Sequence, residues 1–136
     1  MPVDDSDLEA AAAQYASLLP ERIDLVHLGL GPDGHTASLF PGTPQLAVRD
    51  RRVTSGPAGL EPFVERVTLT IPALAGAVAV AFLVTGASKA DAVARAFRAE
   101  PGEDVPASLL RLGAAPIDVY LDEPAAAEAR DPASPG

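Results

Sequence analysis

The stretch IDLVHLGLGPDGHTASLFPGTP, residues 23–44, joins an apolar run to a glycine-rich loop. A short and almost purely apolar run is typical of a strand buried in a parallel sheet. Three glycines, an aspartate and a histidine then fall within residues 29–35. Ligands of open α/β sheets bind beyond the carboxyl ends of the strands. This loop is therefore the first place where a functional site is expected.

The rest of the chain repeats the alternation of strand and turn. The run VAVAFLVTG, residues 78–86, is nearly all apolar and predicts a central parallel strand covered on both faces. Strands that alternate with helices indicate an α/β fold with a mainly parallel sheet flanked by helices. We expect one domain over residues 1–130 and a frayed tail over residues 131–136. The same patterns predict strands at 51–56, 65–71 and 116–122, and helices at 5–19, 35–40, 72–77, 87–100, 106–113 and 123–130.

Composition limits the classes of function. The chain has 136 residues, a net charge of −9 and no cysteine. An acidic chain is a poor ligand for nucleic acid, whose phosphates attract basic faces. Without cysteine there is no disulfide, thiolate metal site or cysteine nucleophile, which fits a reducing cytoplasm. We expect a cytoplasmic protein that binds no membrane, because the apolar runs are far shorter than the roughly 18 residues of a membrane helix and the acidic N-terminus is unlike a secretory signal.

Within the glycine-rich loop, His35 is the candidate for proton transfer. Imidazole exchanges protons near neutral pH and can act as a general base. Glycines let a backbone approach a ligand and expose its N–H groups. We therefore predict that Gly31, Asp33 and Gly34 bind substrate. The alternative is that residues 31–34 form only a turn and that His35 caps a helix, and spacing alone does not decide between the two.

A second candidate site follows the central strand, in TGASKADAV, residues 85–93. Ser88 and Asp91 form a capping-box pattern, so a helix should begin there. Lys89 is the one lysine of the chain and would lie in the first turn of that helix. Helix N–H groups beside an ammonium suit a phosphate. The alternative is a solvated lysine on a surface helix.

Three other observations bear on function. Arg66 precedes VTLTIP and either points to the same cleft or pairs with an acid. His27 lies inside an apolar strand and is interpreted as a hydrogen-bonded structural histidine. No His, Asp and Glu side chains have the spacing of metal ligands, so no metal is predicted.

The motif GLGPDGHTASLFPGTP, residues 29–44, closely resembles the signature of 6-phosphogluconolactonases. ERVTLTIPAL and FLVTGASKADAV resemble later motifs of that family, in the same order. The resemblance implies the α/β fold of the sugar-phosphate isomerases and deaminases. It implies hydrolysis of 6-phosphoglucono-1,5-lactone in the oxidative pentose phosphate pathway, without a cofactor. It also implies that His35 is the general base and that Lys89, together with Arg66, contacts the substrate phosphate.

The chain differs from the related deaminases in one motif and from the 6-phosphogluconolactonases in length. The related glucosamine-6-phosphate deaminases have a loop like DGHIAFNEP with a glutamate, whereas this chain reads DGHTASLFP without an acid, which favours lactone hydrolysis. Family members are nearly twice as long, and their first half has a glycine-rich phosphate loop and an acid–arginine motif that are absent here. The chain resembles the C-terminal part, so we expect a sheet that is incomplete on its N-terminal side, with an open edge that favours self-association. The alternative function is a catalytically inactive fragment that binds sugar phosphate weakly or not at all.

Overall fold

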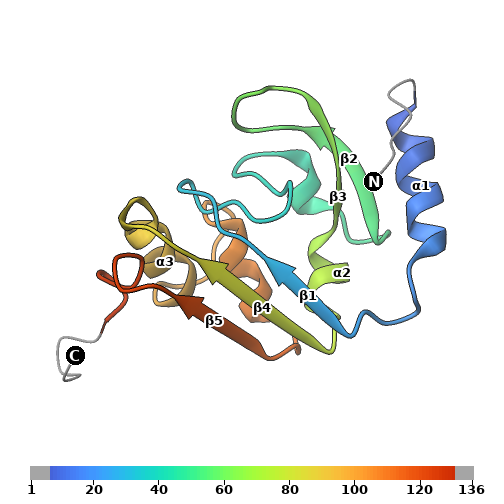
Figure 1. Ribbon diagram of the computed structural model, residues 1–136. Coiled ribbons are helices and arrows are strands. Elements are labelled where there is room, and N and C mark those ends of the chain that lie inside the picture. Colours follow the sequence, from blue (N-terminus) through green and yellow to red (C-terminus); the bar gives the residue numbers. More distant parts are fainter. Residues whose placement is uncertain (1–6, 131–136) are drawn as a thin grey trace.

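The computed structural model describes residues 7–130, and its central feature is a three-stranded parallel sheet (Figure 1). The strand order is β1-β4-β5, with β1 at Leu25–Leu28, β4 at Ala79–Val84 and β5 at Ile117–Leu121. β4 pairs in parallel with both neighbours. The α/β class and the central position of the strand predicted at residues 78–86 are therefore confirmed.

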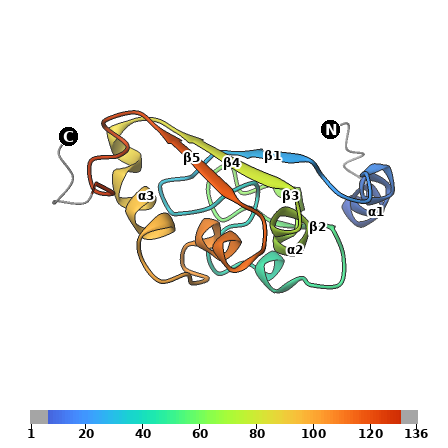
Figure 2. The same ribbon diagram turned by 90° about the horizontal axis from the view of Figure 1, so that it is seen from below.

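Helices cover one face of this sheet (Figure 2). α2, Ile71–Ala75, α3, Ala90–Phe97, and the 3₁₀ helix η3, Pro106–Leu112, lie on that side. The fully buried side chains between these helices and the sheet include Leu74, Val80, Phe82, Val93 and Leu110. Within residues 7–130 no helix lies on the opposite face. The prediction that β4 is covered on both faces is wrong for this chain, because its remaining elements pack elsewhere.

A β-hairpin forms a second, separate sheet. It pairs β2, Val53–Pro57, with β3, Glu65–Leu69, in antiparallel register. The helix α1, Leu8–Leu18, packs on this hairpin and not on the parallel sheet (Figure 1). Two short 3₁₀ turns, η1 at Pro44–Ala47 and η2 at Ala87–Lys89, complete the regular structure of the described residues.

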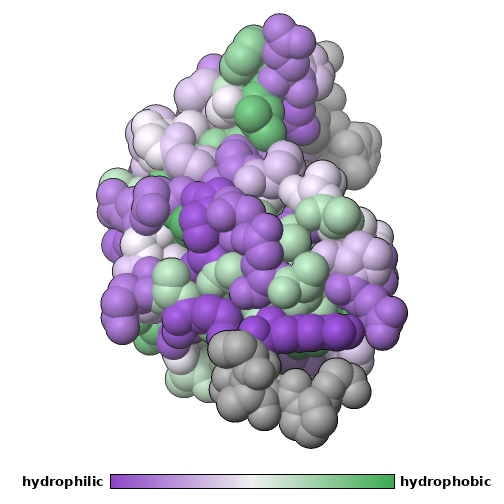
Figure 3. All heavy atoms as spheres, turned by 90° about the vertical axis from the view of Figure 1, so that its left-hand side faces the viewer, coloured by the Kyte–Doolittle hydropathy of each residue, from purple (hydrophilic) through white to green (hydrophobic). Residues whose placement is uncertain are grey.

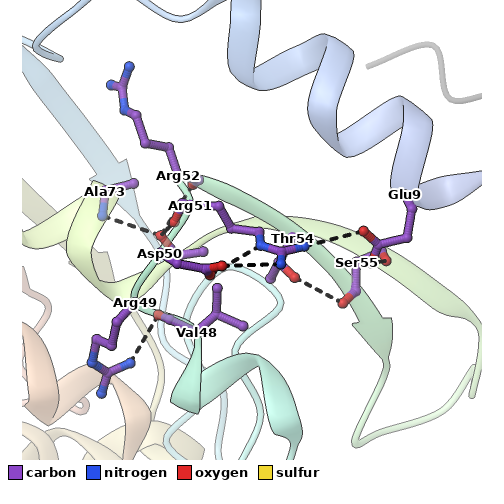
Figure 4. Close-up of polar contacts among 10 residues, drawn as sticks. Glu9, Val48, Arg49, Asp50, Arg51, Arg52, Thr54, Ser55 and Ala73 are labelled. Carbon is purple, nitrogen blue, oxygen red and sulfur yellow. Dashed lines mark hydrogen bonds and ion pairs between the residues drawn. The ribbon is translucent and has the colours of Figure 1, made fainter.

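Polar contacts fasten α1 to the hairpin region (Figure 4). The Glu9 carboxylate accepts a hydrogen bond from the Ser55 hydroxyl at 2.9 Å and another from the Arg51 guanidinium at 3.3 Å. Arg51 also donates to Asp50, and this hydrogen bond and charge hold the pKa of that carboxyl below its ordinary value. These side chains are exposed, so the contacts orient α1 more than they stabilise the fold.

Some predicted helices take another form. Residues 35–40 make turns and the isolated Thr36–Leu39 bridge, because the Thr36 hydroxyl donates back to the Gly29 carbonyl at 2.9 Å and holds the chain out of a helix. Residues 123–129 are also turns.

α1 lies within the helix predicted at residues 5–19, and an aspartate caps its start. Its N-cap is Asp7, whose carboxylate accepts a hydrogen bond from the Ala10 amide at 3.0 Å. Ser6 and the tail at residues 131–136 lie outside the described residues. No helix within residues 7–130 is long and apolar enough to cross a membrane.

Candidate active site

The glycine-rich loop leaves the carboxyl end of β1 and closes on itself. The Gly31 amide donates to the His35 carbonyl at 2.8 Å, and the Gly34 amide donates to the Gly31 carbonyl at 3.0 Å. Gly34 has a φ of +90°, which side-chain-bearing residues rarely adopt. Both amides are thus engaged inside the loop and are not free for a bound oxyanion. Contact of these glycines with a substrate stays a prediction.

His35 and Asp33 form a hydrogen-bonded pair in this loop. The Nδ1 atom of His35 lies 2.6 Å from the Asp33 carboxylate, and the side chains are 23% and 25% exposed. An ionised carboxylate can only accept hydrogen bonds, so Nδ1 carries the proton and the neutral ring keeps a lone pair on Nε2. The Asp33 carboxylate also accepts from the His35 amide at 3.1 Å. Asp33 therefore fixes both the ring orientation and the tautomer of His35.

Gly31 makes room for this pair. A Cβ atom built at Gly31 would lie 2.0 Å from Nδ1 of His35 and 2.7 Å from the Asp33 carboxylate. These distances are far inside van der Waals contact, so any side chain at this position must displace the imidazole. Glycine at position 31 is a steric requirement of the His35 geometry.

Phe40 supports the other side of the histidine. Its ring centroid lies 4.5 Å from that of His35, and Phe40 is buried. Sequence patterns alone miss this contact because residues 35–40 do not form a helix, so the spacing of the two rings follows no regular period. The hairpin covers Phe40 in turn, since a Cβ atom at Gly59 would meet the Phe40 side chain at 2.6 Å.

Lys89 reaches the same loop from β4. η2 follows β4 after Gly86, and the Nζ atom of Lys89 donates to the Leu30 carbonyl at 2.6 Å. An open pocket of about 380 Å³ is lined by Gly29, Leu30, Gly31, Pro32, His35, Ala37 and Lys89. The structure thus brings together His35 and Lys89, the two residues that sequence patterns place at separate strand ends. Figure 3 views the side on which the parallel strands end, where polar side chains cover most of the surface.

The capping box predicted at Ser88 and Asp91 is wrong. α3 begins at Ala90 after the 3₁₀ turn, and no side chain caps it. Asp91 instead pairs with Arg95 one turn later, at 2.8 Å. Asp122 holds the turn at residues 85–88. Its carboxylate accepts a hydrogen bond from the Gly86 amide, whose nitrogen lies 3.0 Å from each carboxylate oxygen.

Arg66 does not line the pocket in this structure. It lies on β3, half-buried, and its nearest hydrogen-bond acceptor is the Pro62 carbonyl at 3.5 Å. Its Nε atom is buried without a partner among the described residues. Two residues along the same strand, the Thr68 hydroxyl accepts from the Ser38 amide at 3.2 Å and joins β3 to the loop of His35. No acid pairs with Arg66 among the described residues, and its contact with the substrate stays a prediction.

His27 and a second pocket lie away from this site. His27 is exposed on the uncovered face of the sheet, and its side chain makes no hydrogen bond within residues 7–130, so the predicted hydrogen-bonded role is not seen. The second pocket, of about 300 Å³, lies beside residues 49–52. Arg49, Arg51 and Arg52 point in different directions there (Figure 4), and Arg52 donates to the Pro20 carbonyl at 2.7 Å. Among residues 7–130 no group of three His, Asp or Glu side chains could hold a metal.

Known proteins resemble this chain in sequence. The family described as glucosamine-6-phosphate isomerases/6-phosphogluconolactonase matches residues 1–118. The chain belongs to this family. It is 53% identical over 110 residues to the 6-phosphogluconolactonase of Synechocystis, covering 74% of this chain and 45% of the relative. It is 38% identical over 127 residues to the 6-phosphogluconolactonase of Homo sapiens, covering 88% of this chain and 49% of the relative.

A solved relative has the same fold. The 6-phosphogluconolactonase from Trypanosoma cruzi superposes with a TM-score of 0.80 at 30% identity, covering 95% of this chain and 55% of that one. The chain therefore spans about half the length of the curated relatives it matches. The expected likeness to part of a 6-phosphogluconolactonase is confirmed.

Proposed function

We propose that this chain carries the proton-transferring half of a 6-phosphogluconolactonase site and hydrolyses 6-phosphoglucono-1,5-lactone to 6-phosphogluconate when the rest of the site is present. The observation that carries the proposal is His35, which hydrogen-bonds to Asp33 and lines a pocket together with Lys89. The names of the relatives support the same reaction. A small polar substrate of this kind fits a cytoplasmic enzyme of the oxidative pentose phosphate pathway.

His35 acts as the general base in this proposal. Its neutral ring takes a proton from water at Nε2 while the water oxygen attacks the lactone carbonyl carbon. The bond from that carbon to the ring oxygen then breaks, and the ring oxygen receives the proton from His35. Asp33 stabilises the imidazolium that forms between the two steps. General-base catalysis contributes about 10² to 10⁴ in rate, which suits an ester that also hydrolyses unaided.

Lys89 binds the substrate phosphate. An ammonium has three N–H donors, and the Leu30 carbonyl accepts one of them. Lys89 and His35 line the same pocket, so one phosphorylated lactone bound there could contact both residues.

Arg66 is the second candidate for the phosphate. Its buried and unpartnered Nε supports this role, because a buried donor without an acceptor costs roughly 1–3 kcal/mol. A phosphate oxygen would satisfy it after a small movement of the hairpin toward the pocket.

Amine chemistry of the deaminase kind is disfavoured. Residues 36–41, which follow His35, contain no acid, so this segment offers the histidine no carboxylate partner for ring opening. Its one carboxylate contact, Asp33, orients Nδ1 and leaves Nε2 for water.

Measuring lactone hydrolysis by two polypeptides distinguishes a chain that supplies half of a working active site from a catalytically inactive fragment. The first is this chain alone. The second, called the joined chain, has at its N-terminus the complementary half, defined as the residues of the Synechocystis relative outside its match to this chain. We expect the joined chain to hydrolyse the lactone at ordinary enzyme rates and this chain alone to stay near the spontaneous rate. A joined chain that folds but adds nothing to the spontaneous rate would refute the proposed function.

A further inference from the structure

Asp122 joins the end of one strand of the parallel sheet to the turn that carries Lys89. It is the first residue after β5, and β5 pairs with β4 as far as Leu121 and Val84. Its carboxylate reaches across this edge and accepts a hydrogen bond from the Gly86 amide, whose nitrogen lies 3.0 Å from both carboxylate oxygens. The turns after the two strands therefore lie side by side (Figure 1), and one side chain fastens them together.

A continuous series of hydrogen bonds leads from Asp122 to the Lys89 ammonium. The Gly86 carbonyl accepts from the Lys89 amide at 3.1 Å, so Gly86 is held at both its N–H and its C=O group. The Nζ atom of Lys89 then donates to the Leu30 carbonyl at 2.6 Å. Asp122 thus fixes the backbone from which the lysine side chain extends toward the loop of His35.

The turn at residues 85–89 has little other support. Gly86 has a φ of +98°, and no side chain caps the start of η2 or of α3, which follow it. Among residues 7–130, the Asp122 carboxylate is the one side-chain acceptor for a backbone amide of this turn. A lysine ammonium sits on a flexible stem of four carbons, so its position depends on how firmly its own backbone is held.

We propose that Asp122 is a positioning residue for the substrate phosphate, and that it acts through Gly86 and Lys89 without contacting the phosphate itself. The inference rests on the proposed role of Lys89 as a phosphate ligand. An ammonium that is already held in place loses less conformational freedom when it binds an anion. Asp122 therefore sets the affinity for the phosphorylated substrate. It leaves the proton transfer at His35 unchanged, because its carboxylate bonds to Gly86 and Ala125 and not to the glycine-rich loop.

The competing explanation is that Asp122 only stabilises the chain that follows β5. Its carboxylate also accepts from the Ala125 amide at 2.9 Å, and Ala125 is fully buried. Loss of that contact alone would affect phosphorylated and unphosphorylated substrates alike, because it does not involve Lys89. The two explanations therefore differ in which substrate is affected and in whether the effect requires Lys89.

Steady-state kinetics of the joined chain separate these explanations. Asp122→Ala should raise KM for the phosphorylated lactone at least fivefold. It should change KM for unphosphorylated gluconolactone, and kcat for both substrates, less than twofold. In a Lys89→Ala background the same substitution should raise KM less than twofold further, because effects that pass through one residue are not additive.

Two further variants serve as controls in the joined chain. Asp122→Asn keeps Oδ1, which accepts from both the Gly86 and the Ala125 amides, and should restore KM to within twofold of the parent. Glu123→Ala removes the neighbouring carboxylate, which is exposed and lies 3.6 Å from the Arg130 guanidinium. It should change KM for either substrate less than twofold.

Acylation of Lys89 tests the proposal in this chain alone, whether or not the joined chain hydrolyses the lactone. Lys89 is the one lysine of the chain, so peptide mass spectrometry can follow its reaction with an N-hydroxysuccinimide ester. Asp122→Ala should release the amine from the Leu30 carbonyl and speed its acylation at least fivefold, whereas Glu123→Ala should change the rate less than twofold. If circular dichroism shows that Asp122→Ala does not fold, Asp122→Glu replaces it with the same expectations, because it keeps the charge but moves the carboxylate by one methylene.

Four outcomes would overturn the proposal. The first two are an unchanged KM in Asp122→Ala and an equal rise in KM for both substrates. The third is an undiminished effect in the Lys89→Ala background, which would show that Asp122 acts by another route. The fourth is acylation at the parent rate in a folded Asp122 variant. A parent joined chain that does not hydrolyse the lactone would refute the proposed function alone, and the acylation rates would then decide whether Asp122 positions Lys89.

Discussion

Replacing Gly31 by alanine should disable the site while leaving the fold intact. The added Cβ would lie 2.0 Å from Nδ1 of His35, whereas ordinary contacts begin near 3.4 Å. The imidazole must therefore move by about 1.4 Å or rotate away from Asp33. A misplacement of about 1 Å can cost 10²-fold in rate, so the joined chain should lose about 10² or more in turnover. The fold should survive, because overpacking of one methyl group costs about 1–3 kcal/mol and the loop lies at the surface.

Gly29→Ala is the matched control for this prediction. It changes the same loop, but a Cβ atom there meets no heavy atom within 4 Å. Turnover of the lactone by the two joined chains should differ by at least tenfold. Proton spectra of the histidine rings, recorded on this chain alone, give a second measurement, since it has only two histidines. The hydrogen-bonded Nδ1 proton of His35 should disappear in Gly31→Ala and persist in Gly29→Ala. Equal turnover with an unchanged Nδ1 signal would refute the steric argument.

Three more predictions follow from named contacts. Lys89→Ala in the joined chain should raise KM for the phosphorylated lactone far more than for unphosphorylated gluconolactone. The reason is that a charge-assisted hydrogen bond to the phosphate is worth roughly 1.5–3 kcal/mol. An equal rise in KM for both substrates would show that Lys89 does not bind the phosphate. Asp33→Asn should lower kcat at least tenfold with little change in KM, as steady-state kinetics would show, because an amide can hold the wrong tautomer of His35; an unchanged kcat would contradict its role. Arg51→Gln should lower the thermal midpoint slightly at neutral pH but not at a pH below the ordinary pKa of aspartate. The reason is that the lowered pKa of Asp50 stabilises the fold while Asp50 is ionised, and this stabilisation is lost when Asp50 is protonated. A decrease in the midpoint that does not depend on pH would exclude this linkage.

The fold class was predictable because it depends on local patterns. The strands at residues 25–28 and 79–84 are short, largely apolar runs followed by glycines, and such runs are typical of a buried parallel sheet. The approach of Lys89 to the loop of His35 was also predictable in outline, since neighbouring parallel strands end at one edge. Family resemblance supplied the reaction, which no pattern of spacing contains.

The finer geometry was not predictable from the sequence. The Asp33 contact with Nδ1 depends on how the loop closes through the Gly31 and Gly34 amides, and a sequence shows only that the residues are near. The capping box at Ser88 failed because a 3₁₀ turn precedes α3 and shifts its start. The uncovered face of the parallel sheet was not predicted, because the sequence of an apolar strand does not show whether helices of the same chain cover one face of the sheet or both.

The rate of lactone hydrolysis by the joined chain, with His35 intact and with His35→Ala, tests the central claim most directly. The parent should exceed the spontaneous rate, and His35→Ala should lower turnover by about 10² or more. His27→Gln, which removes the other histidine of the chain, should stay within a few-fold of the parent. Turnover by His35→Ala within a few-fold of the parent would contradict the account, because His35 would then not be the base.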